Sequence, residues 1–310
     1  MQFIDLFVNI GVIYLGIMLG YAVGRLSGRG SFIEKNLSYI VTYIFVPALF
    51  LNSITEKLAS ATEVIPLTVF SFSFPIVLLL VCYSAVYRKD ITPKTKGAFM
   101  ISGVFSNAIY LPTPIITAVI GVDGIIVVTI FATVQIIIRA TLGTAISIYY
   151  SETVRSKLPK LMLNSILFPP LWATVAGFIL YLFSFHFPAP SNEIIEFTGG
   201  LSIPLSVFIT GLSLSTVKFQ ASNFDLIMRV TLIQLVIAPI LGYLLLIPFS
   251  LSSIIIRSAL VLVFMPPAMS NIIYANVFEL DTKLTSSAVV FTTLILLIFL
   301  PVIIILLTFI

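Results

Sequence analysis

Charged side chains are scarce in this sequence. Asp, Glu, Lys and Arg make up 9% of its 310 residues, against about 25% in a soluble domain, while 59% of the residues are hydrophobic. The 16 basic and 12 acidic residues cannot cover the surface of a water-soluble particle of 34.0 kDa, and the mean hydropathy is +1.18. These values exclude a soluble enzyme, a disordered chain and a secreted disulfide scaffold, and they predict a polytopic membrane protein.

Cysteine and histidine are almost absent. The single cysteine, Cys82, lies in an apolar run and has no partner in the chain, which excludes intrachain disulfides and cysteine metal clusters. With one histidine, no H-E-x-x-H motif and no G-x-S-x-G motif, the sequence lacks the groups that a membrane-bound enzyme would use. We therefore expect no enzymatic activity, no metal and no other cofactor.

Long apolar runs, by contrast, fill the chain. A helix needs about 20 residues to cross a hydrocarbon core of about 30 Å. Runs of this length, separated by charged or Pro/Gly-rich breaks, predict ten spans that lie at residues 4–24, 36–55, 65–87, 97–120, 124–150, 161–185, 195–216, 226–248, 254–276 and 285–309. The lipid bilayer is thus the expected surrounding, and the breaks are too short for an extramembrane domain.

The breaks differ in their content of basic residues. Thirteen Lys and Arg residues lie in or beside the odd-numbered breaks, and only Lys57 and Arg257 lie in the even-numbered ones. Because the cytoplasmic side retains Lys and Arg, we expect both termini to be extracytoplasmic. The net charge of +4 then reflects topology and does not predict binding of nucleic acid.

The two halves of the chain, residues 1–155 and 156–310, share a pattern. Five spans per half is an odd number, so a duplicated second half would be inverted relative to the first. The second span of each half has a mid-span proline followed by phenylalanine, in Val46-Pro47-Ala48-Leu49-Phe50 and Ile203-Pro204-Leu205-Ser206-Val207-Phe208. The fourth span of each half combines two prolines with an asparagine, as Asn107, Pro112 and Pro114 and as Pro266, Pro267 and Asn271.

Paired prolines in one span predict a broken helix. Each proline removes a backbone donor and clashes with the carbonyl one turn earlier, and the freed backbone groups must be buried in protein or line a wet cavity. A lone proline such as Pro47 or Pro204 is more typical of a simple kink. The two clusters therefore predict broken helices that cross near the midplane, where transporters bind their substrates.

At these motifs the chain resembles the auxin efflux carrier family, which includes plant PIN proteins and prokaryotic organic-acid permeases. Asn107 followed seven residues later by Pro114-Ile115-Ile116 resembles the broken fourth helix of that family. Asn164-Ser165-Ile166-Leu167-Phe168-Pro169-Pro170-Leu171-Trp172-Ala173 resembles the opening of its sixth span, although four residues separate the asparagine from the prolines. The segments at Pro204 and Pro266 are similar to its seventh and ninth spans, but Asn271 stands where the plant carriers tend to have another proline.

The resemblance implies an all-α, bile-acid-symporter-like (NhaA-like) fold of ten helices in two inverted five-helix repeats. A scaffold of spans 1, 2, 6 and 7 would hold a transport domain of spans 3–5 and 8–10. Members of the family move organic anions, usually carboxylates, and commonly form homodimers. We therefore expect a secondary transporter for small organic anions, auxin-like or malate-like, that works by alternating access with a site at the crossing of spans 4 and 9.

Arg139 is the one charged side chain deep within a predicted span. Burying Arg at this depth costs about 2.5–3.5 kcal/mol even on lenient scales, so it should face the bundle interior or water. It either caps carbonyls freed by a helix break or supplies positive potential for an anionic substrate, and Gln135 lies one turn earlier on the same face. The candidate substrate-binding residues are Asn107, Tyr110, Pro112, Pro114, Gln135, Arg139, Pro266, Pro267, Ser270 and Asn271.

Carboxylates are missing at mid-depth, since Asp and Glu all lie in or near the breaks. This argues against a cation/proton exchanger, which normally uses an intramembrane carboxylate relay. A sodium site built from Asn, Gln, Ser, Thr and carbonyl oxygens stays open, so the alternatives are a sodium-coupled symporter of the bile-acid type or, in a different class, a channel or a membrane receptor. The coupling ion, sodium or proton, is not determined by the sequence.

Glycines recur every four residues in the first span, at Gly16, Gly20, Gly24 and Gly28. Small residues at this spacing let helices approach closely. The stripe predicts tight packing within the scaffold or, alternatively, a homodimer seam.

Overall fold

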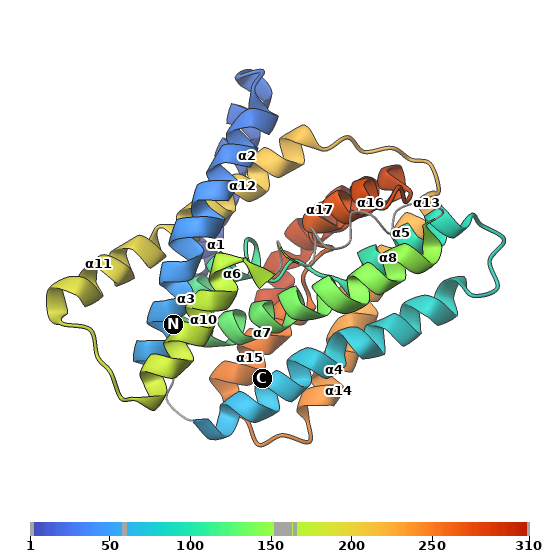
Figure 1. The fold of residues 1–310 in the computed structure, drawn as a ribbon. Coiled ribbons are helices and arrows are strands. Elements are labelled where there is room, and N and C mark those ends of the chain that lie inside the picture. The colour runs from blue at the N-terminus through green and yellow to red at the C-terminus, as the bar shows by residue number, and fades with distance from the viewer. Residues whose placement is uncertain (1–2, 58–60, 152–162, 164–165, 309–310) are drawn as a thin grey trace.

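The computed structural model describes residues 3–57, 61–151, 163 and 166–308, and the regular elements in this part of the chain are helices (Figure 1). The α-helices are α1 (Phe3–Leu26), α2 (Gly30–Ile40), α3 (Val46–Lys57), α4 (Ala61–Val86), α5 (Pro93–Val104), α6 (Pro112–Val119), α7 (Ile125–Ile138), α8 (Thr144–Tyr150), α10 (Pro169–Leu182), α11 (Ala189–Gly200), α12 (Ser202–Thr216), α13 (Phe224–Leu232), α14 (Ala238–Leu246), α15 (Ser253–Val263), α16 (Ser270–Val277) and α17 (Thr282–Thr308). Helices satisfy their backbone groups internally, which apolar surroundings require.

Seven helical stretches of the described chain are long and apolar enough to cross a membrane. They are Val8–Leu26, Gly30–Glu56, Thr62–Val86, Val122–Tyr150, Ala189–Thr216, Phe224–Leu246 and Thr282–Leu307. The other three predicted spans differ from these. Residues 97–120 and 254–276 each contain two short helices, and 161–185 contains the 14-residue α10, with most of its first part outside the described residues. The protein is therefore an all-helical polytopic membrane protein.

Single prolines do not end the long helices, because π-helical segments accommodate two of them. The π-helical segments η1 (Val41–Phe45) and η4 (Ile233–Ile237) join α2 to α3 and α13 to α14. Each ends just before a proline, Pro47 or Pro239, so the residue four positions earlier, whose carbonyl would clash with the ring, lies in the wider turn. A third π-helical segment, η3 (Arg139–Gly143), joins α7 to α8.

The helices pack in two groups. In the α1–α12 group, α1 and α2 pack on α12, and α3 packs on α10 and α11. In the α4–α17 group, α4 packs on α5, α7 and α14, α13 and α5 pack on α17, and α15 packs on α7 and α14. Figure 1 shows the first group on the left and the second on the right. The short helix α6 lies at their junction, since it contacts α1 and α12 as well as α7 and α15.

The glycine stripe of α1 faces α12 of the same chain. A Cβ atom on Gly20 would lie 2.0 Å from the carbonyl oxygen of Phe208, and one on Gly211 would lie 2.0 Å from the carbonyl oxygen of Ile17. Such distances leave no room for a side chain, so the two backbones cross in direct contact. The structure thus assigns Gly20 to packing within the chain. Gly28 has a different role, because its φ of +62° ends the helix in the left-handed region and no atom lies within 4 Å of its ideal Cβ.

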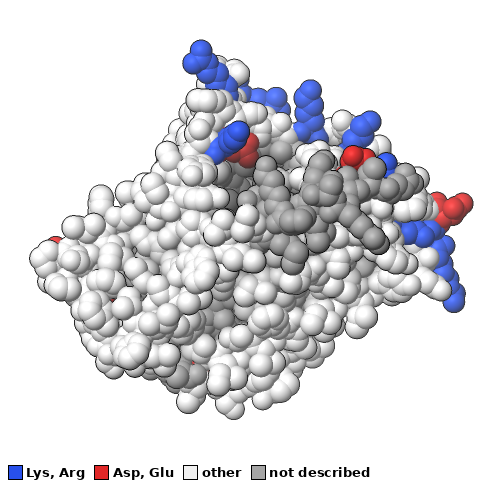
Figure 2. Space-filling view, in the orientation of Figure 1, with Lys and Arg blue, Asp and Glu red and all other residues white. Residues whose placement is uncertain are grey.

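Basic side chains gather along one edge of the face shown in Figure 2, near the turn between α1 and α2 and over the ends of α5 and α13 in Figure 1. At this edge Lys89 pairs with Asp225, and Arg229 Nε lies 3.2 Å from the same carboxylate. The marked ends of the chain lie away from this edge (Figure 1). Described basic residues that the sequence places in different breaks therefore lie along one edge of the molecule (Figure 2).

Candidate functional site

The two helix breaks meet each other. Between α5 and α6, and between α15 and α16, the chain is extended or irregular, and the two segments form one antiparallel bridge. The backbone N of Asn107 donates to the carbonyl of Pro266 at 2.8 Å, and the backbone N of Ala268 donates to the carbonyl of Phe105 at 3.0 Å. Each break thus satisfies backbone groups that the other break frees, because buried backbone groups that cannot reach water must pair within the protein. The predicted pair of broken helices is present, and we call their meeting point the crossing.

Prolines explain where the two helices stop and start again. Pro112 and Pro114 occupy the first turn of α6, where a missing N–H removes no hydrogen bond, whereas Pro266 and Pro267 lie in the buried stretch just before α16. Both α6 and α16 begin at the crossing, so their N-terminal dipoles point there. The first turn of α6 offers no free backbone N–H from its first three residues. Two of these residues are prolines, and the N–H of the third, Thr113, is bonded to the Ile109 carbonyl at 3.2 Å.

The two asparagines of the crossing are used differently. Asn107 Oδ1 accepts from the backbone N of Tyr110 at 3.1 Å and of Ile109 at 3.3 Å, which caps the turn into α6, while no hydrogen bond among the described residues uses its Nδ2. Asn271 is buried, and its Nδ2 donates to the Phe105 carbonyl at 2.8 Å. The amide of Asn107 therefore retains a donor, whereas that of Asn271 is bonded across the crossing.

Arg139 links the two breaks. Its guanidinium donates to Ser270 Oγ at the start of α16 and to the Ser106 carbonyl in the other break, the latter at 3.3 Å. The guanidinium carbon lies 5.3 Å from the centre of the Phe105 ring, at cation–π distance. The Arg139 carbonyl accepts from the backbone N of Thr144 across the π-helical turn and also from Tyr274 Oη at 3.2 Å. Arg139 thus caps a carbonyl freed by a break, and its charge lies at the crossing.

The positive charge of Arg139 has no carboxylate partner within the described chain. Its hydrogen bonds go to a hydroxyl and a carbonyl, and its Nε is buried without a partner. A buried cation held only by neutral groups leaves positive potential that an anion can use. One turn earlier, Gln135 is buried, and neither atom of its amide has a hydrogen-bond partner in the described chain. The structure therefore does not bond Gln135 to Arg139 or to either break.

Tyr110 connects the crossing to the α1–α12 group. Its hydroxyl is bonded to Thr42 Oγ1 in η1 and lies 3.4 Å from the Ser38 carbonyl in α2. Beside it a cavity of about 20 Å³ lies between the two helix groups. The lining residues are Asn107, Tyr110, Leu111, Ile209, Thr210, Ser213, Leu214, Pro267, Met269, Val289 and Thr293. This volume accommodates about one water molecule, so the space at the crossing is closed in this structure.

Three of the predicted residues line this cavity, namely Asn107, Tyr110 and Pro267. Arg139 and Ser270 meet at the crossing outside its lining, and the remaining predicted residues shape the breaks or lie one turn away.

Gln234 supports the end of α5 and was not among the predicted site residues. Its Nε2 donates to the carbonyls of Ser102 at 3.2 Å and Gly103 at 2.9 Å, both in the last turn of α5 before the break. A lone amide in an otherwise apolar span was the available signal, because buried polar residues in membrane helices usually bond to something specific.

Glu34 forms a second contact that sequence reasoning missed. Its Oε1 accepts from Ser213 Oγ at 2.5 Å and its Oε2 from Thr216 Oγ1 at 2.7 Å, so α2 is bonded to α12 close to the small cavity that Ser213 lines. No signal in the sequence pairs these residues, since they are about 180 positions apart.

Comparison with known proteins shows to which family this chain belongs. A family model described as membrane transport protein matches residues 7–156 and 151–304. A protein of Methanothermobacter thermautotrophicus named as an uncharacterized transporter is 22% identical over 286 residues, which are 92% of this chain and 93% of that protein. Another uncharacterized transporter, from Methanocaldococcus jannaschii, is 23% identical over 266 residues, 84% of this chain and 85% of that protein. The similarity thus extends over most of all three chains.

Proposed function

Because the chain belongs to the family of membrane transport proteins, we propose that it is a secondary transporter that carries small organic anions by alternating access. The observation that carries this proposal is Arg139, a cation at the crossing of two broken helices with no carboxylate partner in the described chain. A carboxylate that leaves water needs a compensating charge or several hydrogen bonds. Arg139 offers the charge, and Asn107 Nδ2 offers a donor.

We further propose ten spans in two inverted halves, residues 1–155 and 156–310, with both termini outside the cytoplasm. The matched breaks in the predicted spans 97–120 and 254–276 support the repeat. The basic edge of Figure 2 and the position of the chain ends in Figure 1 support the orientation.

We propose that the α1–α12 group is the scaffold of spans 1, 2, 6 and 7 and that the α4–α17 group is the transport domain of spans 3–5 and 8–10. The cavity at the crossing has walls from both groups, with Thr210 and Ser213 on α12 and Asn107 and Pro267 on the breaks. A substrate larger than water therefore enters only if the two groups move apart. Rigid-body movement of one group past the other would open the crossing alternately to each side.

Uptake into proteoliposomes tests the function. Purified protein is reconstituted and supplied with radiolabelled acetate, L-malate or indole-3-acetate, with a neutral sugar and a quaternary amine as controls. We expect saturable uptake of at least one carboxylate and none of either control. Fast conductance without saturation would indicate a channel, and the absence of uptake of all carboxylates would contradict organic-anion transport.

Coupling and assembly are tested on the same preparation. Uptake is measured with an imposed sodium gradient, with an imposed proton gradient and with neither, because both neutral oxygen ligands and the Glu34 carboxylate, which accepts from Ser213, lie near the cavity at the crossing. A homodimer, which we also propose, is measured as the protein mass in the detergent complex by light scattering.

A further inference from the structure

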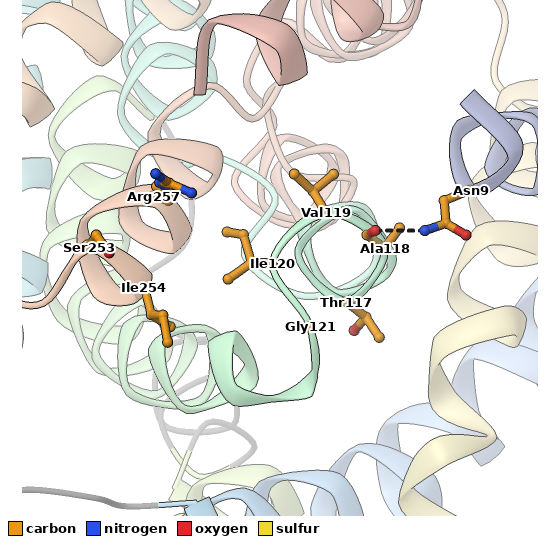
Figure 3. Close-up of a pocket in the computed structure, with 9 residues that line it drawn as sticks. All are labelled: Asn9, Thr117, Ala118, Val119, Ile120, Gly121, Ser253, Ile254 and Arg257. Atoms are coloured by element: carbon orange, nitrogen blue, oxygen red, sulfur yellow. Dashed lines mark hydrogen bonds between the residues drawn. The ribbon is translucent and has the colours of Figure 1, made fainter. Parts of the chain in front are cut away.

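A larger cavity, with a volume of about 440 Å³, lies away from the crossing, between α1, α6 and α15 (Figure 3). Its polar lining consists of Asn9, Thr117, Ser253 and Arg257. Its apolar lining comes from the last turn of α6 and from Ile254. Pockets that bind small molecules have volumes of about 300–1,000 Å³ and combine an apolar wall with a few polar groups. This cavity has both properties, whereas the cavity at the crossing has room for about one water.

The cavity lies over the crossing along two half-helices. α6 runs from the crossing at Pro112 to the cavity at Val119, and α15 runs from the cavity at Arg257 to the crossing after Val263. At 1.5 Å per residue, each path covers about 10 Å. The third wall, α1, belongs to the other helix group, so the cavity also lies on the boundary along which the groups would separate. The proposed topology places this end of both half-helices outside the cytoplasm.

Among the described residues that line the cavity, Arg257 is the only charged one. Its Nε is buried and has no hydrogen-bond partner, and no carboxylate of the described chain forms an ion pair with it. Two of the other polar lining residues bond to α6, since Asn9 Nδ2 donates to the Ala118 carbonyl at 2.8 Å (Figure 3) and Thr117 Oγ1 donates to the Thr113 carbonyl at 2.9 Å. On α4, Glu63 accepts from the backbone N of Ser252 at 2.6 Å and so caps the start of α15. An arginine with no partner in the described chain, beside an apolar wall, matches a carboxylate that carries an organic group.

We propose that this cavity is an entry site, in which Arg257 binds the carboxylate of an organic anion on the extracytoplasmic side before the anion reaches Arg139. The inference rests on the proposed function. In this arrangement the two arginines act in sequence, about 10 Å or more apart along α6 and α15, and opening of the boundary between α1 and α6 passes the anion from one to the other.

Thiol labelling inside the cavity tests this directly. Ser253 lines the cavity, is exposed and lies four residues before Arg257 on α15, whereas the native Cys82 is buried. In S253C protein in a neutral maltoside detergent, which excludes anionic lipid headgroups, we compare the rates of an anionic and a cationic methanethiosulfonate reagent. A positive charge about 6 Å from the reacting thiol attracts the anionic reagent and repels the cationic one. In water this raises the anion-to-cation rate ratio by about tenfold without salt and by about threefold when salt screens the charge. Arg257→Gln should lower the ratio by this factor.

Two matched variants control the measurement. Arg257→Lys keeps the charge and should keep most of the ratio, and Arg229→Gln removes a distant exposed charge and should leave the ratio unchanged. In S253C protein, millimolar L-malate or indole-3-acetate should slow labelling by the anionic reagent, and in the S253C/R257Q protein it should not. Protein without S253C reports the background reaction of Cys82.

An unchanged ratio in R257Q, or equal protection with and without Arg257, would overturn the entry site. Protection by sulfate as strong as that by the organic acids would also overturn it, because the apolar wall would then contribute nothing. These outcomes are independent of carboxylate uptake by the wild-type protein, which tests the proposed function alone.

Discussion

Replacing Arg139 by Gln separates its two roles, because the structure predicts a small effect on folding and a large one on anions. The guanidinium donates to Ser106 and Ser270, and a hydrogen bond to a charged group contributes about 1.5–3 kcal/mol. Gln keeps one neutral hydrogen bond, so the lost hydrogen bonds lower the free energy of unfolding by about 2–4 kcal/mol. Against it, removal of the charge relieves the cost of a buried Arg, about 2.5–3.5 kcal/mol. We therefore expect the free energy of unfolding to change by less than about 2 kcal/mol.

The effect on a bound anion has no such compensation. A carboxylate about 5 Å from the guanidinium at an effective dielectric constant of about 20 gains about 3 kcal/mol, which corresponds to about 100-fold in affinity. Arg139→Gln should lose this factor in apparent affinity for the carboxylate. Arg139→Lys should recover part of it, since the point charge remains, but a lysine cannot reach both Ser106 and Ser270 with a planar fork.

Melting temperature and carboxylate uptake are measured on the same purified variants. Arg229→Gln is the matched control, because it removes one positive charge from an exposed ion pair with Asp225 and should change neither quantity. A stable Arg139→Gln protein with unchanged uptake would remove Arg139 from the mechanism. Loss of folding in both Arg139 variants would instead assign this residue to structure alone.

Three further predictions follow from local contacts. Asn107→Ala should weaken carboxylate binding several-fold in a thermal-shift titration, because a free amide donor is lost. Asn271→Ala should mainly lower the melting temperature, because it removes a buried hydrogen bond across the crossing and leaves the Phe105 carbonyl with the Ala268 backbone N as its donor. Equal effects of the two substitutions would contradict the distinction. Gly20→Ala should lower the free energy of unfolding by about 1–3 kcal/mol, since its Cβ would overlap a backbone carbonyl, whereas Gly11→Ala, with no atom within 4 Å, should not destabilise the protein in the same assay. An impermeant thiol reagent added outside should label a cysteine at the exposed Lys35 in inverted vesicles, whose cytoplasmic side faces outward, and not in right-side-out vesicles. The opposite result would reverse the proposed topology.

Much of the fold could be read from the sequence because its cause is local. Long apolar runs become helices, since a chain in apolar surroundings must satisfy its backbone within each segment. Pro112, Pro114 and Pro266 predicted the breaks for a similar reason, because the missing donor and the ring clash act within one turn. The accommodation of Pro47 by a π-helical segment instead of a sharp kink was not predictable, since both responses satisfy the same local constraint.

The candidate site was predictable in membership but not in arrangement. Asn107 and Asn271 look alike in the sequence, beside prolines in matching spans, yet one keeps a free donor and the other is bonded to Phe105. Arg139 was recognisable in the sequence as a costly buried charge, but its role as cap or as anion ligand could not be decided from the sequence. Its bonds to both breaks support the first role, and its lack of a carboxylate partner in the described chain is the basis for proposing the second.

The sequence by itself determined the class of the protein, the positions of its helices and breaks, and the asymmetry of its basic residues. These depend on composition and on interactions over a few residues. The tertiary structure alone decided that Gly20 packs on Phe208, that Glu34 bonds α2 to α12 and that Arg257 lines a cavity over the crossing. Such contacts join residues more than a hundred positions apart, and a small change in how two helices cross would make or remove them. No local pattern in the chain encodes that geometry.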